Sequence, residues 1–266
     1  AHWVWGGGWI GADGAGALDF AGGTVIHINA GAAAVAAAIL VGRRRNPGLQ
    51  SNNVPYVVLG ASILWFGWFG FNGGSALAAD DYAVNAMLVT QIAAGTAATV
   101  WGLIGYASTN KISAVGVATG AVAGLVAITP AAGAVNALGA LAIGAGAGVL
   151  CYFAVEIIHR SNLDDALDVF AVHGVGGIWG CIATGIFAIE SIAGVKGLIQ
   201  GDVTQVWIQI YTAAGTLAYS FIVSFAILFI LNKIPGLELR SNESEENSGL
   251  DLSAHGEQAF VSDGAD

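Results

Sequence analysis

The chain has 266 residues, of which 56% are hydrophobic and only 10% are charged. Since a soluble globular domain carries roughly 25% charged residues, this composition excludes an ordinary soluble protein and favours a membrane protein. Forty glycines with only four prolines also exclude a proline-rich disordered chain. The formal net charge is −10, which at first indicates that the whole chain is acidic. An acidic chain repels the phosphates of nucleic acids, so we expect no nucleic-acid partner.

Seven long apolar runs follow one another along the chain, separated by charged or turn-forming residues. Because about 20 apolar residues span the hydrocarbon core of a bilayer, each run predicts a transmembrane helix. We therefore expect an all-α, polytopic membrane bundle. The expected spans are residues 20–42, 54–79, 82–108, 112–129, 135–158, 169–189 and 203–231.

Basic residues are concentrated after the first, third, fifth and seventh runs, whereas Lys196 alone follows the sixth. Basic residues are enriched in the cytoplasmic loops of membrane proteins. The pattern therefore predicts a multi-pass protein of the cell membrane with its C-terminus in the cytoplasm. The residues that set this orientation are Arg43, Arg44, Arg45, Lys111, Arg160, Lys233 and Arg240.

The composition changes after Pro235. Residues 236–266 contain eight acidic residues and one arginine, so they carry a net charge of −7 out of the total of −10. We expect residues 1–235 to form the membrane domain and residues 236–266 to form an acidic cytoplasmic tail. The acidity is thus mostly a property of the tail. The segment GLDLSAHGEQAF (249–260) is less repetitive than the rest of it and is a candidate for docking.

Small residues predict how the helices pack. Glycines recur every fourth residue at 116, 120 and 124, and again at 144 and 148. Such faces let helix backbones approach closely inside a membrane. Cys151 and Cys181 both lie in apolar runs and fit neither a disulfide framework nor a metal-binding knuckle, so we interpret them as packing residues.

Two histidines lie well inside predicted spans, His27 in GGTVIHINAG and His173 in DVFAVHGVGGIWG. Ionisable residues at membrane depth are costly and usually functional. The functional interpretation is a pair of imidazoles along a narrow path, where each donates or accepts a hydrogen bond or relays a proton. The structural alternative is two unrelated histidines, each bonded to a backbone carbonyl. Two similar glycine-rich settings on different helices favour function.

Two carboxylates stand at the starts of the same two segments, Asp19 and Asp168. An aspartate at a helix start can cap exposed amides and complement the helix dipole. We expect this structural role for both residues. The rival role is attraction of cations at the entrance of a pathway. Near the end of the fifth run, Glu156 is expected to reach the interface or to pair with Arg160.

The second run contains LWFGWFGFNGGSALA, in which Trp68, Phe71 and Ser75 fall on one helix face. Aromatic faces attract cations or form a hydrophobic plug, and a serine hydroxyl can accept a hydrogen bond from an ammonium-like donor. Trp5, in the opening AHWVWGGG, lies on the same side of the membrane by the derived topology. The alternative is an interfacial aromatic belt, with Ser75 hydrogen-bonded inside its helix.

Together these segments resemble the ammonium transporter family (Amt/MEP/Rh), and its Amt branch in particular. The resemblance rests on AHWVWGGG, LDFAGGTVIHINAG, GWFGFNGGSA, ITPAAG, DVFAVHGVGGIWG with GIFA after it, and GLDLSAHGEQAF, in this order along nearly the whole chain. It implies a homotrimer of bundles, each with one pore, built from two inverted halves of five helices plus an eleventh helix.

The resemblance also implies roles for individual residues. His27 and His173 resemble the twin histidines that line the hydrophobic pore of the family. Trp5 and Ser75 resemble members of the outer ammonium recruitment site. Phe71 resembles one ring of the phenylalanine gate. Two further matches are Trp68, as a pore-lining aromatic residue, and Asp19, as the aspartate that supports the recruitment site.

The chain departs from the family in length, because it shows seven spans where the family has about eleven. The spans present match the fifth helix onward, so we expect the chain to be a fragment of a longer protein, with one inverted half complete. The partner ring of the phenylalanine gate should then come from the part that precedes it.

The sequence therefore predicts an ammonium or ammonia transport protein that serves nitrogen utilisation, with no enzymatic activity, metal or cofactor. One alternative is an ammonium sensor that signals through the tail. In that case a trimeric PII signalling protein, which the resemblance implies as a partner, would dock on the tail; otherwise the tail is merely a solubilising end. The other alternative is a redox membrane protein with His27 and His173 as axial haem ligands.

Overall fold

The computed structural model describes residues 1–48 and 53–257, and every regular element within these ranges is a helix. Seven helical segments are long and apolar enough to cross a membrane: Gly23–Val41, Val54–Gly74, Asp81–Thr109, Ala114–Ala131, Ala137–Arg160, Phe170–Phe187 and Thr204–Leu231. Their number and order agree with the seven apolar runs, and their ends differ from the predicted ends by a few residues. The prediction of an all-α bundle with seven spans is confirmed.

The elements that build these spans are as follows. The first four spans are η1 (Gly23–Ile28) with α2 (Asn29–Val41), α3 (Val54–Gly74), α4 (Asp81–Thr109), and α5 (Ala114–Ile128) with η2 (Thr129–Ala131). The last three are α6 (Ala137–Arg160), η3 (Phe170–Gly174) with α7 (Val175–Phe187), and α9 (Thr204–Leu231). Short helices lie outside them: α1 (His2–Trp5), α8 (Glu190–Ala193), η4 (Leu198–Gln200), α10 (Glu243–Ser248) and η5 (Asp251–His255).

Polar side chains at the N-termini define where four of the spans begin. Asn53, Asp80, Ser113 and Asn136 each accept a hydrogen bond from a backbone N–H in the first turn of α3, α4, α5 and α6. Such caps satisfy amide groups that have no partner inside the helix. The apolar runs therefore become helices whose starts are set by a single side chain.

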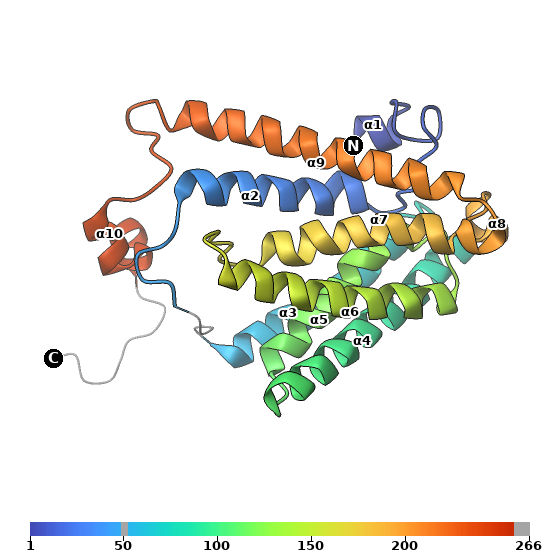
Figure 1. Cartoon of the computed structure of the whole chain (residues 1–266), viewed down its shortest axis with the longest axis horizontal. Coiled ribbons are helices and arrows are strands. Elements are labelled where there is room, and N and C mark those ends of the chain that lie inside the picture. The colour runs from blue at the N-terminus through green and yellow to red at the C-terminus, as the bar shows by residue number, and fades with distance from the viewer. Residues whose placement is uncertain (49–52, 258–266) are drawn as a thin grey trace.

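The helices form two closely packed groups that lie side by side (Figure 1). In the first group α4, α5 and α6 pack on one another, and α3 covers α4 and α5. In the second group α2 lies beside α9, and α7 contacts α9 and the η1 turn. Contacts of α7 with α5 and α6 join the two groups.

The predicted glycine faces lie where α5 and α6 cross α4. A methyl group on Gly124 would lie 2.7 Å from the Ala97 Cβ, and one on Gly148 would lie 2.9 Å from the Ala97 carbonyl oxygen. Likewise, a methyl group on Gly144 would lie 2.8 Å from the Ala93 Cα. These distances leave no room for a side chain, so the prediction of close packing through small residues is confirmed.

Both cysteines are buried and form no disulfide. Cys151 packs in a cluster with Trp101 and Val126, and Cys181 packs with Ile28. Burial among apolar neighbours is typical of cysteines that only fill space. Their interpretation as packing residues is confirmed.

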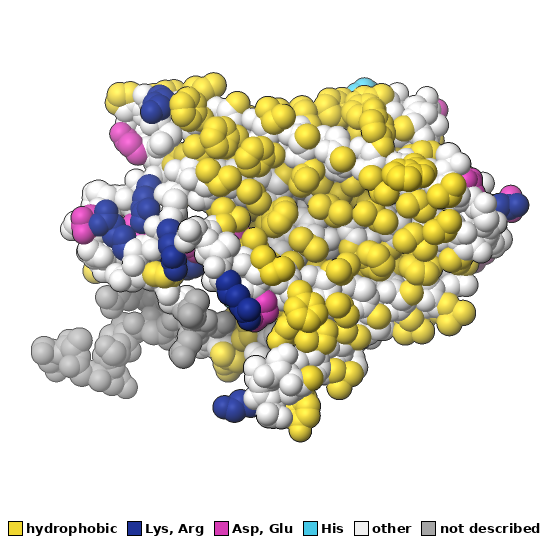
Figure 2. Space-filling model, in the orientation of Figure 1, with side chains coloured by type: hydrophobic (Ala, Val, Ile, Leu, Met, Phe, Trp, Pro, Cys, Tyr) yellow, Lys and Arg dark blue, Asp and Glu magenta, His cyan; other side chains and the backbone are white. Residues whose placement is uncertain are grey.

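The surface carries the pattern expected of a multi-pass membrane protein. Figure 2 shows hydrophobic side chains across the middle of the molecule and most of the lysine and arginine side chains at the end where α10 lies. On α3, Ile63 and Phe66 are 62% and 78% exposed, as suits a lipid-facing helix. We call the end that carries Arg44, Arg160 and Arg240 the basic end of the bundle.

Candidate functional site

Two of the spans begin with a π-helical turn, and each of these turns carries one of the two membrane-depth histidines. His27 lies in η1 before α2, and His173 lies in η3 before α7. In a π-helical turn the hydrogen bond joins residues five apart along the chain, and such turns occur frequently at functional sites. The sequence predicted helices here but contained no signal for the wider turns.

The two histidine side chains contact each other. Their Nδ1 atoms lie 3.1 Å apart, and their ring centroids lie 5.2 Å apart. Because one Nδ1 must donate and the other must accept, only one proton lies between the facing nitrogens. Two neutral rings would thus be opposite tautomers, one protonated on Nδ1 and the other on Nε2. Chemically, the pair can pass a proton or hydrogen-bond a small polar molecule.

Glycines allow the two histidine helices to approach this closely. A methyl group on Gly31 would lie 2.5 Å from the backbone nitrogen of Gly174, beside His173. Reciprocally, a methyl group on Gly177 would lie 3.1 Å from the Cβ of His27. Gly31, one turn after His27, therefore lies against His173, and Gly177, one turn after His173, lies against His27. This reciprocal pattern means that α2 and α7 cross as an antiparallel pair with local two-fold symmetry.

Asp19 holds the start of the His27 turn. Its carboxylate accepts hydrogen bonds from the backbone N–H groups of Gly22, Gly23, Thr24 and Val25, and from the Thr24 hydroxyl. The aspartate is 7% exposed, so these donors replace the water that the carboxylate lacks. The prediction that Asp19 caps its helix is confirmed.

The corresponding prediction for Asp168 is wrong, because Asp165 provides the cap. The Asp165 carboxylate accepts from the backbone N–H groups of Val169 and Phe170, at 2.9 and 2.7 Å. Asp168 adopts a left-handed backbone, with a φ of 54°, and its carboxylate lies 2.8 Å from His159 Nε2 at the end of α6. Its role is therefore to tie the loop to α6. Burial raises the pKa of Asp168, and the nearby His159 opposes that shift.

A common spacing links the two halves of the site. In each half the capping aspartate precedes the histidine by eight residues, and the facing glycine follows it by four. The two copies are Asp19–His27–Gly31 and Asp165–His173–Gly177. Sequence reasoning missed Asp165 because Asp168 stands nearer to the predicted span. Aligning the two segments on their histidines would have identified it.

Aromatic rings of α3 cover His27. The Trp68 ring stacks on the His27 ring at 5.4 Å with an interplanar angle of 13°. Phe71 meets both rings edge-on, at 6.0 Å from His27 and 5.3 Å from Trp68. The Trp68 Nε1–H donates to the Thr129 hydroxyl at 3.0 Å, which fixes the orientation of the indole. The structure thus brings Trp68, Phe71 and the histidine pair into one cluster.

Trp5 and Ser75 lie at the margin of this cluster. The Trp5 Nε1–H donates to the backbone oxygen of Asp19 at 2.7 Å, and its ring is half exposed. The Ser75 hydroxyl donates to the Phe71 carbonyl at 2.7 Å. In the described part of the chain no hydrogen bond joins Trp5 to Ser75. Trp5 is instead held by Asp19, and Ser75 is hydrogen-bonded inside α3, as the alternative interpretation expects.

A buried glutamine positions the loop that carries Asp19. Gln209 of α9 accepts from the Leu18 backbone N–H at 2.9 Å and donates to the Leu18 carbonyl at 2.7 Å. Its amide also donates to the Cys181 carbonyl of α7 at 3.1 Å. Gln209 was not predicted, because an uncharged glutamine in an apolar run carries no charge that marks it out in the sequence.

The histidine geometry does not fit a haem with two axial histidines. Metal–imidazole bonds of about 2.0 Å would place the two ligating nitrogens roughly 4 Å apart, with the metal between them. In the structure the facing nitrogens lie 3.1 Å apart, within direct hydrogen-bonding distance of each other. The facing Nδ1 atoms therefore leave no room for a metal ion between them.

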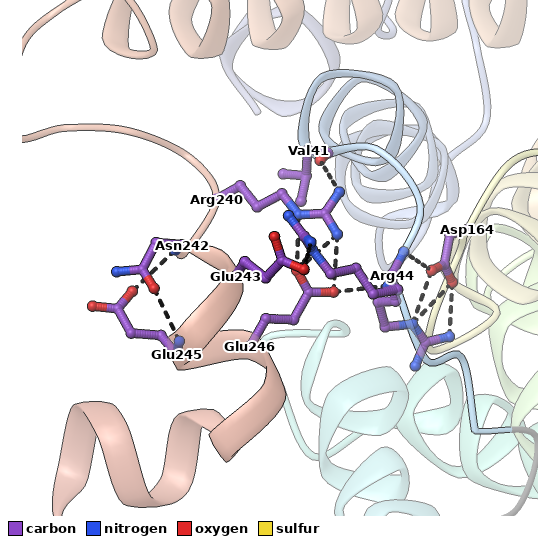
Figure 3. A network of polar contacts seen from close by, with 9 residues as sticks. Val41, Arg44, Asp164, Arg240, Asn242, Glu243, Glu245 and Glu246 are labelled. Atoms are coloured by element: carbon purple, nitrogen blue, oxygen red, sulfur yellow. Dashed lines mark hydrogen bonds and ion pairs between the residues drawn. The ribbon is translucent and has the colours of Figure 1, made fainter.

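The tail contacts the bundle at the basic end. Glu246 of α10 accepts from the Arg45 backbone N–H at 2.8 Å and pairs with the Arg240 guanidinium at 2.8 Å (Figure 3). Arg240 also donates to the Val41 carbonyl at the end of α2. The tail is therefore held on the bundle through residues 240–246, whereas the hydrogen bonds of the described residues 249–257 stay within the tail. Of the GLDLSAHGEQAF segment, residues 258–260 lie outside the described residues.

A second ion pair joins the loops that leave α2 and precede η3. The Arg44 guanidinium contacts the Asp164 carboxylate at 2.7 Å (Figure 3). The hydrogen bonds from Arg44 lower the pKa of Asp164 to about 2. On the neighbouring helix, Glu156 pairs with Arg160 at 3.0 Å, which confirms the expected pairing.

Comparison with known proteins identifies the family. A model described as the Ammonium Transporter Family matches residues 1–260. This chain belongs to that family. An ammonium transporter from Aquifex aeolicus is 51% identical over 261 residues, which cover 98% of this chain and 60% of that protein. The ammonium transporter Amt1 of Archaeoglobus fulgidus is 45% identical and is covered over 66% of its length.

Solved structures of the family share the fold. The crystal structure of Mep2 from Candida albicans superposes with a TM-score of 0.85 at 38% identity, covering 92% of this chain and 56% of Mep2. A structure described as a sensor Amt protein has a TM-score of 0.85 at 36% identity and is covered over 65% of its length. The chain thus spans about 60% of the length of its relatives. A family of transporters also agrees with the expectation that the chain is not an enzyme.

Proposed function

We propose that this chain forms part of an ammonium transport protein, in which the transported nitrogen passes His27 and His173. The observation that carries the proposal is the direct Nδ1 contact between the two imidazoles. It lies between two spans of a chain that belongs to the Ammonium Transporter Family. A histidine pair covered by aromatic rings supplies hydrogen-bonding groups in an otherwise apolar layer, which suits a small polar molecule that crosses without its charge.

The residues around the pair take up the ion at the outer side. In this proposal Trp5 and Ser75 form part of the recruitment site, and Phe71 is the ring that the nitrogen passes next. Two hydrogen bonds support this assignment. Trp5 donates to the backbone of Asp19, and Ser75 donates to the backbone of Phe71, so both side chains are fixed beside residues that lead to His27. Trp68 lines the path beside His27.

The proton of ammonium leaves before the nitrogen passes the histidine layer. Transferring an ion into apolar surroundings is far more costly than transferring a neutral molecule that keeps a hydrogen bond. His27 is 3% exposed, so its burial disfavours a positive charge in this layer. The histidine pair then holds ammonia by hydrogen bonds or relays the released proton.

The test is uptake of labelled methylammonium. Since this chain spans about 60% of the Aquifex aeolicus transporter, it would replace the matching segment of that protein in a chimaera expressed in cells without ammonium transporters. Replacing both His27 and His173 with Ala should reduce selective uptake to background. The control is His255→Ala, which removes an exposed histidine of the tail. Uptake and selectivity equal to the parent chimaera after the double replacement would refute the pore assignment.

We also propose an assembly and a topology. The basic end faces the cytoplasm, since basic residues collect in cytoplasmic loops. Residues 1–235 form the membrane domain, and residues 236–266 form a cytoplasmic tail. The complete protein is a homotrimer. Size-exclusion chromatography with light scattering in detergent tests the trimer, and cysteine labelling of the tail from one side of the membrane tests the topology.

A second candidate function is ammonium sensing. It is favoured by the contact of the tail with the loop after α2, through Glu246, and by the similarity to a sensor Amt protein. In this scheme a PII protein docks on the tail and the basic end. Deleting residues 236–266 from the chimaera should then abolish PII binding while leaving uptake largely intact. Unchanged PII binding would contradict the sensing role of the tail.

A further inference from the structure

Three buried side-chain polar atoms have no hydrogen-bond partner in the described part of the chain, and they belong to one neighbourhood. They are His27 Nε2, Trp65 Nε1 and Asn72 Oδ1. Buried polar atoms are nearly always paired, so an unpaired one calls for an explanation, such as a ligand or a water molecule. Asn72 is fully buried, which makes its free oxygen the strongest case of the three.

The two atoms on α3 flank the histidine layer. Trp65, Trp68 and Asn72 are spaced by three and four residues, so they lie on one face of α3. Trp68 stacks directly on His27. Trp65 is therefore about one turn before the His27–Trp68 layer, toward the basic end, and Asn72 is about one turn beyond it.

The orientation of the Asn72 amide follows from its neighbour. The Thr90 hydroxyl donates its proton to the Ala86 carbonyl at 2.6 Å, so toward Asn72 it can only accept. Accordingly, the Asn72 NH₂ group donates to the Thr90 oxygen at 2.9 Å. This bond fixes the planar amide, and its oxygen lies on the other branch, without a partner.

The two free atoms have opposite chemistry. The Asn72 oxygen is an acceptor, whereas an indole N–H is a donor only. Ammonium has N–H donors and no lone pair, so it can bind to the oxygen but not to the indole N–H. Ammonia has both and can bind to either. An acceptor on one side of the histidine layer and a donor on the other thus match the nitrogen before and after it loses its proton.

We propose that Asn72 Oδ1 and Trp65 Nε1–H are binding points for the transported nitrogen on opposite sides of the His27–Trp68 layer. Asn72 receives ammonium or ammonia, and Trp65 receives only ammonia. This inference rests on the proposed transport function and adds two specificity-determining residues to it. The order of acceptor, histidines and donor along α3 admits the protonated form on one side of the layer only.

Binding at Trp65 is tested on the purified chain in detergent micelles by NMR. The chain is labelled with ¹⁵N at its eight indoles, and the Trp65 resonance is assigned by its loss in Trp65→Phe. Ammonium chloride is titrated at pH 7 and at pH 9, with potassium chloride as the control. The Trp65 resonance should shift at pH 9, where the share of ammonia is larger, and stay nearly unchanged at pH 7. An absent shift, or equal shifts at both pH values, would overturn the assignment of Trp65.

Transport by the chimaera tests Asn72. Losing a hydrogen bond from a charged donor weakens binding by about tenfold or more. Asn72→Leu, which removes the oxygen at similar volume, should therefore raise the KM for methylammonium about tenfold. Trp65→Phe should lower the maximal rate several-fold and leave KM nearly unchanged. The matched control is Trp207→Phe on the exposed side of α9. An unchanged KM in Asn72→Leu would overturn the role of Asn72.

The two experiments separate this inference from the proposed function. A pH-dependent indole shift in the purified chain, together with a parent chimaera that does not transport, would refute transport while keeping the ammonia site. Transport by the parent chimaera without an indole shift would refute the site alone. Thermal unfolding of each purified variant identifies any that loses activity by misfolding, and for such a variant the NMR titration of the unmodified chain still decides the Trp65 site.

Discussion

At the residue scale, two aspartate carboxylates fix the helical turns that carry His27 and His173, and so fix the orientation of the two imidazole rings. Asp19 and Asp165 both accept hydrogen bonds from backbone N–H groups at the start of a π-helical turn. Charged acceptors bond more strongly than neutral ones and complement the positive end of a helix. The direction of each imidazole therefore depends on an aspartate eight residues earlier as well as on its own packing.

Replacing Asp165 with Asn should destabilise the start of η3. An amide keeps one acceptor oxygen, but its NH₂ group cannot accept a hydrogen bond from the second backbone N–H. We therefore expect the unfolding free energy to fall by about 1 kcal/mol. Thermal unfolding of the purified chain in detergent measures the loss. Asp251→Asn in the exposed η5 turn is the control and should leave the unfolding temperature unchanged. Equal effects in both variants would contradict the capping role.

Sequence reasoning recovered the residues whose chemistry is unusual for a membrane. His27 and His173 were predicted because ionisable groups are rare at that depth, and Asp19 because it stands at the start of the first run as a capping residue. Asp165 was missed because a nearer aspartate competed for the same role, and the choice depended on a backbone turn with a positive φ at Asp168. Asn72 and Gln209 were missed because neutral polar residues are common in helices, and only the fold shows them buried.

At the element scale, one antiparallel crossing determines whether the histidines meet. The α2 and α7 helices approach at Gly31 and Gly177: a side chain on Gly31 would overlap the Gly174 backbone, and one on Gly177 would be in tight contact with His27. The spans themselves were predictable because long apolar runs stand out in a sequence. The crossing was not, since its glycines are indistinguishable in sequence from other glycines of the bundle. Gly95, for example, faces open space.

The variant Gly31→Ala should therefore separate the two helices. Its methyl group would overlap the Gly174 backbone, and overpacking of this kind costs about 1–3 kcal/mol. Gly95→Ala on α4 is the matched control and should be neutral or stabilising by up to about 1 kcal/mol, because alanine favours helix. Thermal unfolding of both variants, together with uptake by the chimaera, checks the difference. A stable and active Gly31→Ala variant would show that the crossing tolerates a wider separation.

The Arg44–Asp164 ion pair joins the loop after α2 to the loop before η3. We expect it to make the unfolding free energy of the chain depend on pH. Because the folded pKa of Asp164 is lowered from 3.8 to about 2, its contribution is present above its ordinary value and is lost as the pH falls toward 2. Arg44 is 45% exposed, so the contribution is at most about 1 kcal/mol. Thermal unfolding between pH 5 and pH 2, compared with Arg44→Gln, should show a smaller pH dependence in the variant. Identical pH profiles would contradict this role.

At the scale of the whole molecule, the tail and the membrane helices meet through few charged groups. Figure 3 shows Glu246 between Arg240 and the segment that leaves α2. Consecutive arginines after α2 thus have different partners, since Arg44 contacts the loop before η3 and Arg45 contacts the tail. Composition predicted a separate acidic tail, but it did not reveal that Glu246 pairs with Arg45 across some 200 residues.

Replacing Glu246 with Gln should release the tail. The hydrogen bonds from Arg45 and Arg240 lower the pKa of Glu246, so docking is fully present above its ordinary pKa of 4.5 and weakens as the pH falls below 4.5 toward the lowered pKa of the docked tail. Hydrogen–deuterium exchange at neutral pH should then increase over residues 240–250 while the spans stay protected. The control, Glu257→Gln, changes an exposed glutamate and should exchange like the unmodified chain. Unchanged exchange in Glu246→Gln would show that other contacts hold the tail.

The interval between each capping aspartate and its histidine is the same in both copies. The site should therefore depend more on the number of residues in this interval than on which residues they are. One residue added to a helix turns every side chain beyond it by about 100°. An insertion between Asp19 and His27 would thus rotate one imidazole away from its partner, although no residue of the site had been replaced. The seven intervening residues differ almost completely between the two copies, yet their number is the same. Variation in this region should therefore consist of substitutions, with insertions and deletions confined to the loops outside both intervals.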